Sequence, residues 1–199
     1  MGRLFLVVLV AAGIAWYFVA HARASNSEHE LAAVASTIAG RPVGIHCQSF
    51  GGELVDVTSE PGKVEFDQYG KPGDKASFKR KVCKALQRLP SDVRKPEFDC
   101  VDRDVSCPGR VHDDAWAVLV FAHESIHLAG ELNESFAQCK GLQNVEFVSR
   151  RLGVGSKRSK AIAKYAWKYV YPEADEEYRT DACFNGGPLD VRPGNPRWP

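Results

Sequence analysis

The sequence predicts a single, mainly helical α+β domain that is exported and held together by disulfides. Three observations support this: helical apolar spacing dominates the second half, short β-branched stretches lie between residues 43 and 67, and six cysteines follow an apolar N-terminal segment. The chain has 199 residues, 44% of them hydrophobic, which fits one domain. Its net charge of +1 gives no reason to expect a nucleic-acid partner.

Residues 1–24 have the pattern of an export signal or an N-terminal membrane anchor. Arg3 precedes an uncharged run from Leu4 to Ala20, and Ala22-Arg23-Ala24 matches an A-x-A cleavage site. The run is long for a signal peptide and close to the shortest that spans a membrane, so cleavage and anchoring both remain open. In either case we expect residues 25–199 to form one extracytoplasmic domain, secreted or anchored by the N-terminal segment, with no other membrane contact.

All six cysteines follow this segment, so an oxidising compartment predicts three disulfides. Cys100 and Cys107 are the favoured pair because only a short polar loop separates them. The spacing C-x-x-C is absent, which argues against cysteine ligands for zinc. Cys139 is expected to pair with one of Cys47, Cys83 and Cys183.

The region from residue 27 to residue 67 is predicted to hold a helix followed by a small antiparallel sheet. A capping box at Ser27 and Glu30 begins the helix, and Gly40 follows its apolar stripe. Gly-Gly and Pro-Gly turns then separate short β-branched stretches, which predict two or three strands. The candidate strands are Val43–Ser49, Glu53–Thr58 and Lys63–Asp67.

Further helices are expected on both sides of a Pro-rich loop. A basic helix is predicted from Lys75 to Leu89, with its charges on a solvated face, and an irregular loop from Pro90 to Arg110. The tail from Pro172 is too apolar to be free, so we expect it to lie along the body of the domain, fixed by Cys183. The later helices are expected at Glu134–Leu152 and Ser159–Val170.

The strongest chemical signal is the motif H-E-x-x-H, formed by His123, Glu124 and His127. No Gly or Pro interrupts the run from Ala115 to Leu128, and Asp113-Asp114 offers a cap, so we expect the motif on a helix. This helix is apolar on all sides, which predicts that it is buried. Two histidines at this spacing share one face and can bind one metal ion. A buried structural cluster of His and Glu without a metal is the alternative.

A catalytic zinc ion takes three protein ligands and leaves one position open, so a third ligand is expected. In an unbroken helix, Glu134 would lie about 10 Å beyond the second histidine along the axis. Gly130 offers a break, however, and Asn133 can cap a second helix that folds back and brings Glu134 to the histidines. We therefore predict Glu134 as the third ligand, with Glu131 or a distant acidic residue as alternatives.

The segment HESIHLAGELNE resembles the zincin metallopeptidases, and its H-E-x-x-H-x-x-G opening is similar to the metzincin signature. Asn133 stands where a metzincin carries its third ligand, whereas a carboxylate on the following helix is similar to the gluzincin plan, with a shorter spacing. The pattern HESIHLAGELNESFAQC, with the closing CFNGGPLDVRPGNPRWP, also resembles a group of small uncharacterised exported actinobacterial proteins. The resemblance implies His123 and His127 as metal ligands and Glu124 as the general base.

We therefore expect a zinc metallopeptidase in a small zincin-like domain, with one Zn²⁺, an active-site helix pair and a short sheet whose edge strand holds a peptide or protein substrate. Glu124 would take a proton from zinc-activated water and pass it to the leaving amine. We expect a monomer. Two other classes stay open: a zinc-binding protein without catalysis, and a disulfide-stapled cell-envelope interaction protein. The candidates for an oxyanion donor are Tyr165, Tyr169, Tyr171, Tyr178 and His112.

Overall fold

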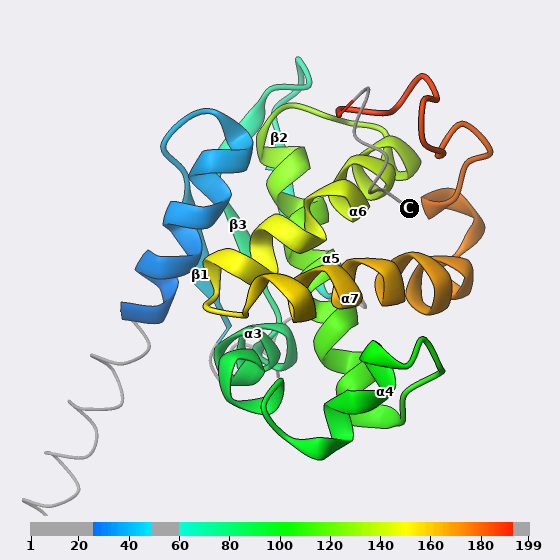
Figure 1. The fold of residues 1–199 in the computed structure, drawn as a ribbon. Helices are drawn as coiled ribbons and strands as arrows, with labels where there is room; N and C mark the ends of the chain where they lie inside the picture. The colour runs from blue at the N-terminus through cyan, green and yellow to red at the C-terminus, as the bar shows by residue number, and fades with distance from the viewer. Residues whose placement is uncertain (1–25, 49–59, 193–199) are drawn as a thin grey trace, which may run out of the picture.

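The sheet of this protein is small and mixed. The computed structural model describes residues 26–48 and 60–192. Within them β1 (Gly44–Cys47), β2 (Gly62–Phe66) and β3 (Pro72–Phe78) form a sheet in the order β1-β3-β2 (Figure 1). β2 pairs with β3 antiparallel, whereas β1 pairs with β3 in parallel, so the prediction of an antiparallel sheet is wrong for β1. The predicted strand at Glu53–Thr58 lies outside the described residues.

β3 occupies part of the segment that was predicted to be a basic helix. Ala76 and Phe78 are buried and Lys75 is exposed, which is the alternation of a strand. This alternation is short and lies among lysines, and the pairing of β3 with two other strands decides its conformation. α3 (Arg80–Asp92) therefore begins later than predicted, and it includes Pro90, which was expected to lie in the loop.

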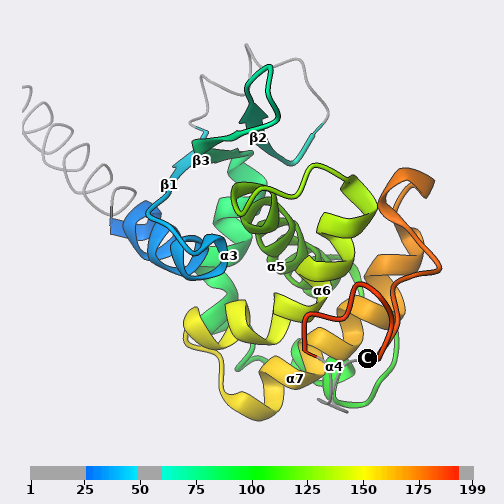
Figure 2. The same ribbon diagram turned by 90° about the horizontal axis from the view of Figure 1, so that it is seen from above.

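α5 (Gly109–Leu128) is the central helix of the domain. It lies between the sheet and α6 (Glu134–Arg151), and it also packs against α3 (Figure 2). α5 begins before the predicted cap, because Asp114 lies inside the helix, where it is buried and forms an ion pair with Arg88 of α3. As predicted from its apolar surface, most of α5 is buried.

The remaining described helical segments complete a mainly helical α+β fold, as predicted. The predicted third long helix is divided into α7 and a π-helical continuation, and the predicted loop before α5 contains two short helical turns. These segments are the helix at 26–39, η1 (Pro96–Phe98), α4 (Asp99–Asp102), α7 (Ser156–Tyr165), η2 (Ala166–Val170), η3 (Tyr171–Glu173) and η4 (Glu176–Tyr178). The largest fully buried core residues include Phe78, Leu86, Phe121, Val145 and Ile162.

The six cysteines form three disulfides, as predicted, so none of them is free to bind zinc. The predicted pair of Cys100 with Cys107 is confirmed, and Cys139 pairs with Cys183, one of its three expected partners. Such a set is typical of an oxidising, extracytoplasmic compartment. The third disulfide joins Cys47 of β1 to Cys83 of α3.

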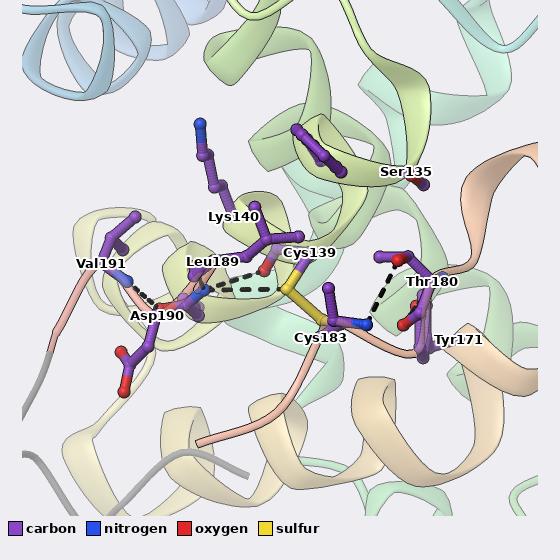
Figure 3. The surroundings of a disulfide bond; sticks show 12 residues. Ser135, Cys139, Lys140, Tyr171, Thr180, Cys183, Leu189, Asp190 and Val191 are labelled. Atoms are coloured by element: carbon purple, nitrogen blue, oxygen red, sulfur yellow. Dashed lines mark hydrogen bonds between the residues drawn. A yellow bond between two sulfur atoms is a disulfide. The ribbon is translucent and has the colours of Figure 1, made fainter. Parts of the chain in front are cut away.

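The C-terminal part of the described chain lies against α6, as predicted (Figure 3). Cys183 is bonded to Cys139 of α6, and Leu189 is buried. The Gln143 side chain of α6 donates a hydrogen bond to the carbonyl of Leu189 (2.8 Å) and accepts one from the Val191 N–H (2.9 Å). Across residues 26–48 and 60–192, no helix has both the length and the apolar character needed to span a membrane. The predicted export segment at 1–24 lies outside these residues.

Candidate metal centre

The two motif histidines face each other in the interior of the protein. His123 and His127 lie one turn apart on α5, and only 5% and 4% of their surfaces are exposed. Their ring centroids are 4.5 Å apart, and the two Nε2 atoms are separated by 2.8 Å. The helical spacing thus brings two nitrogen donors to one point, as predicted.

Glu134 completes a group of three donor atoms. α5 ends before Gly130, whose φ of 105° suits glycine, and the Asn133 side chain caps α6 by accepting a hydrogen bond from the Phe136 N–H at 3.0 Å. Because α6 turns back, Glu134 Oε2 lies 3.0 Å from Nε2 of the first histidine and 3.2 Å from that of the second. All three donor atoms lie within 4.8 Å of one another.

Glu131, the alternative third ligand, points elsewhere. Its carboxylate forms an ion pair with Lys140 at 2.5 Å and accepts a hydrogen bond from the Asn133 N–H. Its backbone carbonyl does contribute to the centre, because it lies 2.6 Å from His127 Nδ1 and can fix the orientation of that ring. Of the two acidic residues considered after the motif, the structure brings Glu134 to the histidines.

A glycine on α6 allows the close approach of the two helices. Gly141 lies two turns after Glu134, on the same face of α6. A Cβ atom placed at Gly141 would lie 3.0 Å from the backbone N of His123 and 3.1 Å from its Cα, which is closer than nearly all real contacts. The packing role of Gly141 was not predicted, although a glycine inside a predicted helix often has such a role.

The three donors differ in how their protonation suits a cation, and Glu134 suits it best. Burial lowers the pKa of His123, although hydrogen bonding to Glu134 opposes this. Burial acts in the same direction on His127, but hydrogen bonds to Glu134 and to the Glu131 carbonyl raise its pKa overall. Hydrogen bonds from His123 and His127 lower the pKa of Glu134 to about 2, so this carboxylate is ionised at neutral pH. Metal binding needs an ionised carboxylate and neutral imidazoles.

Glu124 lies beside this group in a very different environment. Only 6% of its surface is exposed, and within the described part of the chain its carboxylate has no hydrogen-bond partner. Burial raises its pKa to about 8; His127 opposes this, whereas Glu134 adds to it. The carboxylate packs against Gly62 of β2, where a Cβ atom would lie 2.7 Å from Glu124 Cγ. This close approach at Gly62 was not predicted from the sequence.

The histidines and Glu124 line a cleft of about 650 Å³ between β2 and the segment 173–178. Of the predicted oxyanion donors, Tyr178 lines this cleft, with its ring centroid 5.7 Å from that of His123. Burial and the neighbouring Glu134 raise the pKa of Tyr178 to about 12, so it keeps its proton. The other candidates form hydrogen bonds with other partners. His112 is paired with Tyr165, the Tyr169 hydroxyl donates to the Asp104 carbonyl, and the Tyr171 hydroxyl accepts from the Thr180 N–H.

The disulfide between α6 and Cys183 also supports this cleft. Glu134 and Cys139 lie on α6, and Tyr178 lies five residues before Cys183. The covalent bond therefore joins the helix that carries the third donor to the segment that forms the opposite wall. Comparison of the chain with protein-family models, curated proteins and solved structures found no match.

Proposed function

We propose that this protein is a zinc-dependent metallopeptidase. The observation that supports this most directly is the group of His123, His127 and Glu134 donors in an accessible cleft. Two imidazole nitrogens and one carboxylate oxygen match the ligands of catalytic zinc sites, which leave a further position open. The buried Glu124 carboxylate, which has no hydrogen-bond partner among the described residues, fits the same proposal, because a buried polar group needs a partner that a bound ligand can provide.

In this proposal, Glu124 is the general base and then the general acid. When bound, zinc would lower the pKa of a water molecule toward neutrality and polarise the carbonyl of the substrate. Burial gives Glu124 a high proton affinity, which suits it to hold a proton and donate it to the leaving amine, and a cation bound at the neighbouring ligands would favour the ionised form that accepts the proton. The hydroxyl of Tyr178, which stays protonated in the same cleft, would donate a hydrogen bond to the developing oxyanion.

β2 would position the substrate backbone in this mechanism. Its only partner among the described residues is β3, which leaves its other edge open toward the cleft within that part of the chain. An extended peptide can add to such an edge through backbone hydrogen bonds. Strand addition would place a peptide bond beside the motif histidines, because Gly62 to Val64 and both histidines line the same cleft.

The test combines metal analysis with one conservative substitution. We expect the purified protein to contain one zinc ion per chain, and a chelator to lower its melting temperature. Glu124→Gln should retain zinc but cleave a broad peptide library about 10² to 10⁴ times more slowly than the wild type. Glu97→Gln, at an exposed residue outside the cleft, is the control and should have full activity.

Two results would contradict the proposal in different ways. If the wild type and Glu124→Gln both retain zinc and neither cleaves any peptide, the protein binds zinc without being a peptidase. If the purified protein contains no zinc and chelation leaves its melting temperature unchanged, it is a metal-free protein stapled by its disulfides. The proposal places the mature domain outside the cytoplasm, secreted or anchored, and acting as a monomer on peptides or proteins.

A further inference from the structure

The cleft carries acidic side chains that the proposed chemistry does not use. Glu173, Asp175 and Glu177 line one wall, and Glu60 lines the other wall just before β2. Lys63 is the only lysine or arginine among the described residues that line this cleft. Because the whole chain has a net charge of only +1, these carboxylates are a local concentration of negative charge.

Glu60 marks one end of the cleft. β2 and α5 run in the same direction along it, because Gly62 packs against Glu124 while the ring of Phe66 lies 5.8 Å from that of His127. Glu60 precedes Gly62 and therefore lies toward the start of α5.

The opposite wall brings the Glu173 carboxylate to the same end. Glu173 lines both the cleft and an adjoining hollow, and Trp116, two turns before the first histidine on α5, lines both as well. The other end of the cleft is apolar, because it is lined by Phe66 and by Leu132, which is 55% exposed. The candidate metal ligands lie between an acidic end and an apolar end.

Few cations of the protein neutralise the acidic end. Lys63 is exposed and lies 3.9 Å from Glu65, which is more exposed still. Lys81 lies 4.7 Å from the ring centroid of Trp116, in the adjoining hollow. The Glu173 carboxylate lies 3.4 Å from Nε2 of His112, which is not one of the motif histidines. Among the residues that the structure describes, no lysine or arginine forms an ion pair with Glu60, Asp175 or Glu177.

We propose that the cleft selects peptides that place a lysine or arginine side chain at the end formed by Glu60 and Glu173, and an apolar side chain at the end formed by Phe66 and Leu132. This inference rests on the proposed function insofar as it takes the cleft to be a peptide site. Carboxylates without cationic partners attract a positively charged ligand during the encounter and in the complex. The Glu124 side chain in the same cleft is 6% exposed and has no hydrogen-bond partner among the described residues, which separately indicates a site that receives a polar ligand.

The experiment measures binding separately from cleavage. Two fluorescein-labelled peptides, identical except that one carries lysines where the other carries glutamates, are titrated with the full zinc-loaded chain in a Glu124→Gln background that slows hydrolysis. Each exposed carboxylate–ammonium contact contributes roughly 1.4- to 5-fold in affinity, so with two contacts the lysine peptide should bind about 2- to 25-fold more tightly than the glutamate peptide. The preference should weaken as salt is added.

The decisive variant is the double substitution Glu60→Gln with Glu173→Gln, which should bring the preference close to unity. The matched control removes two exposed charges outside the cleft, by Glu30→Gln with Glu97→Gln, and should keep the preference. Equal binding of the two peptides, binding of neither, or a preference that survives in the first double variant would overturn the inference. If the lysine peptide binds with the expected preference but the wild type cleaves no peptide, the peptidase proposal fails and the selectivity stands.

Discussion

Gly62→Ala tests directly whether the position of Glu124 controls catalysis. The new Cβ atom would lie 2.7 Å from Glu124 Cγ and 2.8 Å from Oε1, whereas ordinary contacts begin at 3.4 Å. β2 is held in place because Gly62 pairs with Phe78 of β3. The flexible carboxylate therefore has to give way, by about 0.7 Å. Gly62 does not have a positive φ, so the backbone itself accepts alanine.

The expected effect is a loss of rate without a loss of metal. A misplacement of about 1 Å in an active site costs on the order of 10²-fold, so kcat/KM should fall about 10- to 100-fold. Zinc affinity should change by less than about twofold, because the three atoms nearest to the new methyl group all belong to Glu124, which is not a proposed ligand. Peptide hydrolysis and calorimetric zinc titration of the same preparations measure these two quantities.

Gly44→Ala is the matched control for this substitution. Gly44 also begins a strand of the same sheet, but a Cβ atom there meets Lys75 Cβ at an ordinary 3.4 Å. We expect this variant to retain wild-type activity. Full activity of Gly62→Ala would refute the reasoning about Glu124, and an equal loss of activity in both variants would show that the effect comes from the sheet rather than from the base.

Three further predictions follow from the same contacts. Gly141→Ala pushes α6 away from the α5 backbone and should lower zinc affinity by about tenfold or more in a calorimetric titration, because Glu134 moves with α6; unchanged affinity would contradict the packing argument. Replacing Cys139 and Cys183 by alanine should lower the free energy of unfolding by about 2–5 kcal/mol in urea and weaken peptide binding, while zinc affinity, which depends on α5 and α6 alone, stays within about twofold. Burial raises the pKa of Asp114 to about 6, so between pH 4 and 6 the folded state binds more protons than the unfolded state. The metal-free protein should therefore lose up to about 2–3 kcal/mol of stability from this group as the pH rises through that window, and Asp114→Asn should remove this component from urea titrations.

The geometry of the donor group was predictable because it is local. All three donors lie within a stretch of twelve residues, from His123 to Glu134. The period of the helix fixes the two histidines, and two local signals, a glycine break and an Asn133 cap, fix the return of Glu134. Whether the group binds zinc remains a prediction.

The cleft walls were not predictable, because residues that are distant in sequence form them. Glu60 and Glu177 stand on opposite walls, and nothing in the spacing of their neighbours relates the two positions. The parallel pairing of β1 with β3 was missed for the same reason, since it depends on contacts between residues 44–47 and 75–78. Gly62 and Gly141 are recognisable only once the atoms that occupy the missing Cβ space are known.

This division between local donors and distant walls has a physical consequence. The donor group depends on one helical hairpin whose helices approach closely at Gly141, so perturbations of the sheet or the C-terminal segment should leave it intact. The walls depend on connections across the fold: a disulfide from β1 to α3 on the side of the sheet and another from α6 to Cys183 on the opposite side. A reducing environment should therefore weaken substrate recognition before it weakens metal binding. An export signal would deliver the chain to the kind of compartment in which both disulfides persist.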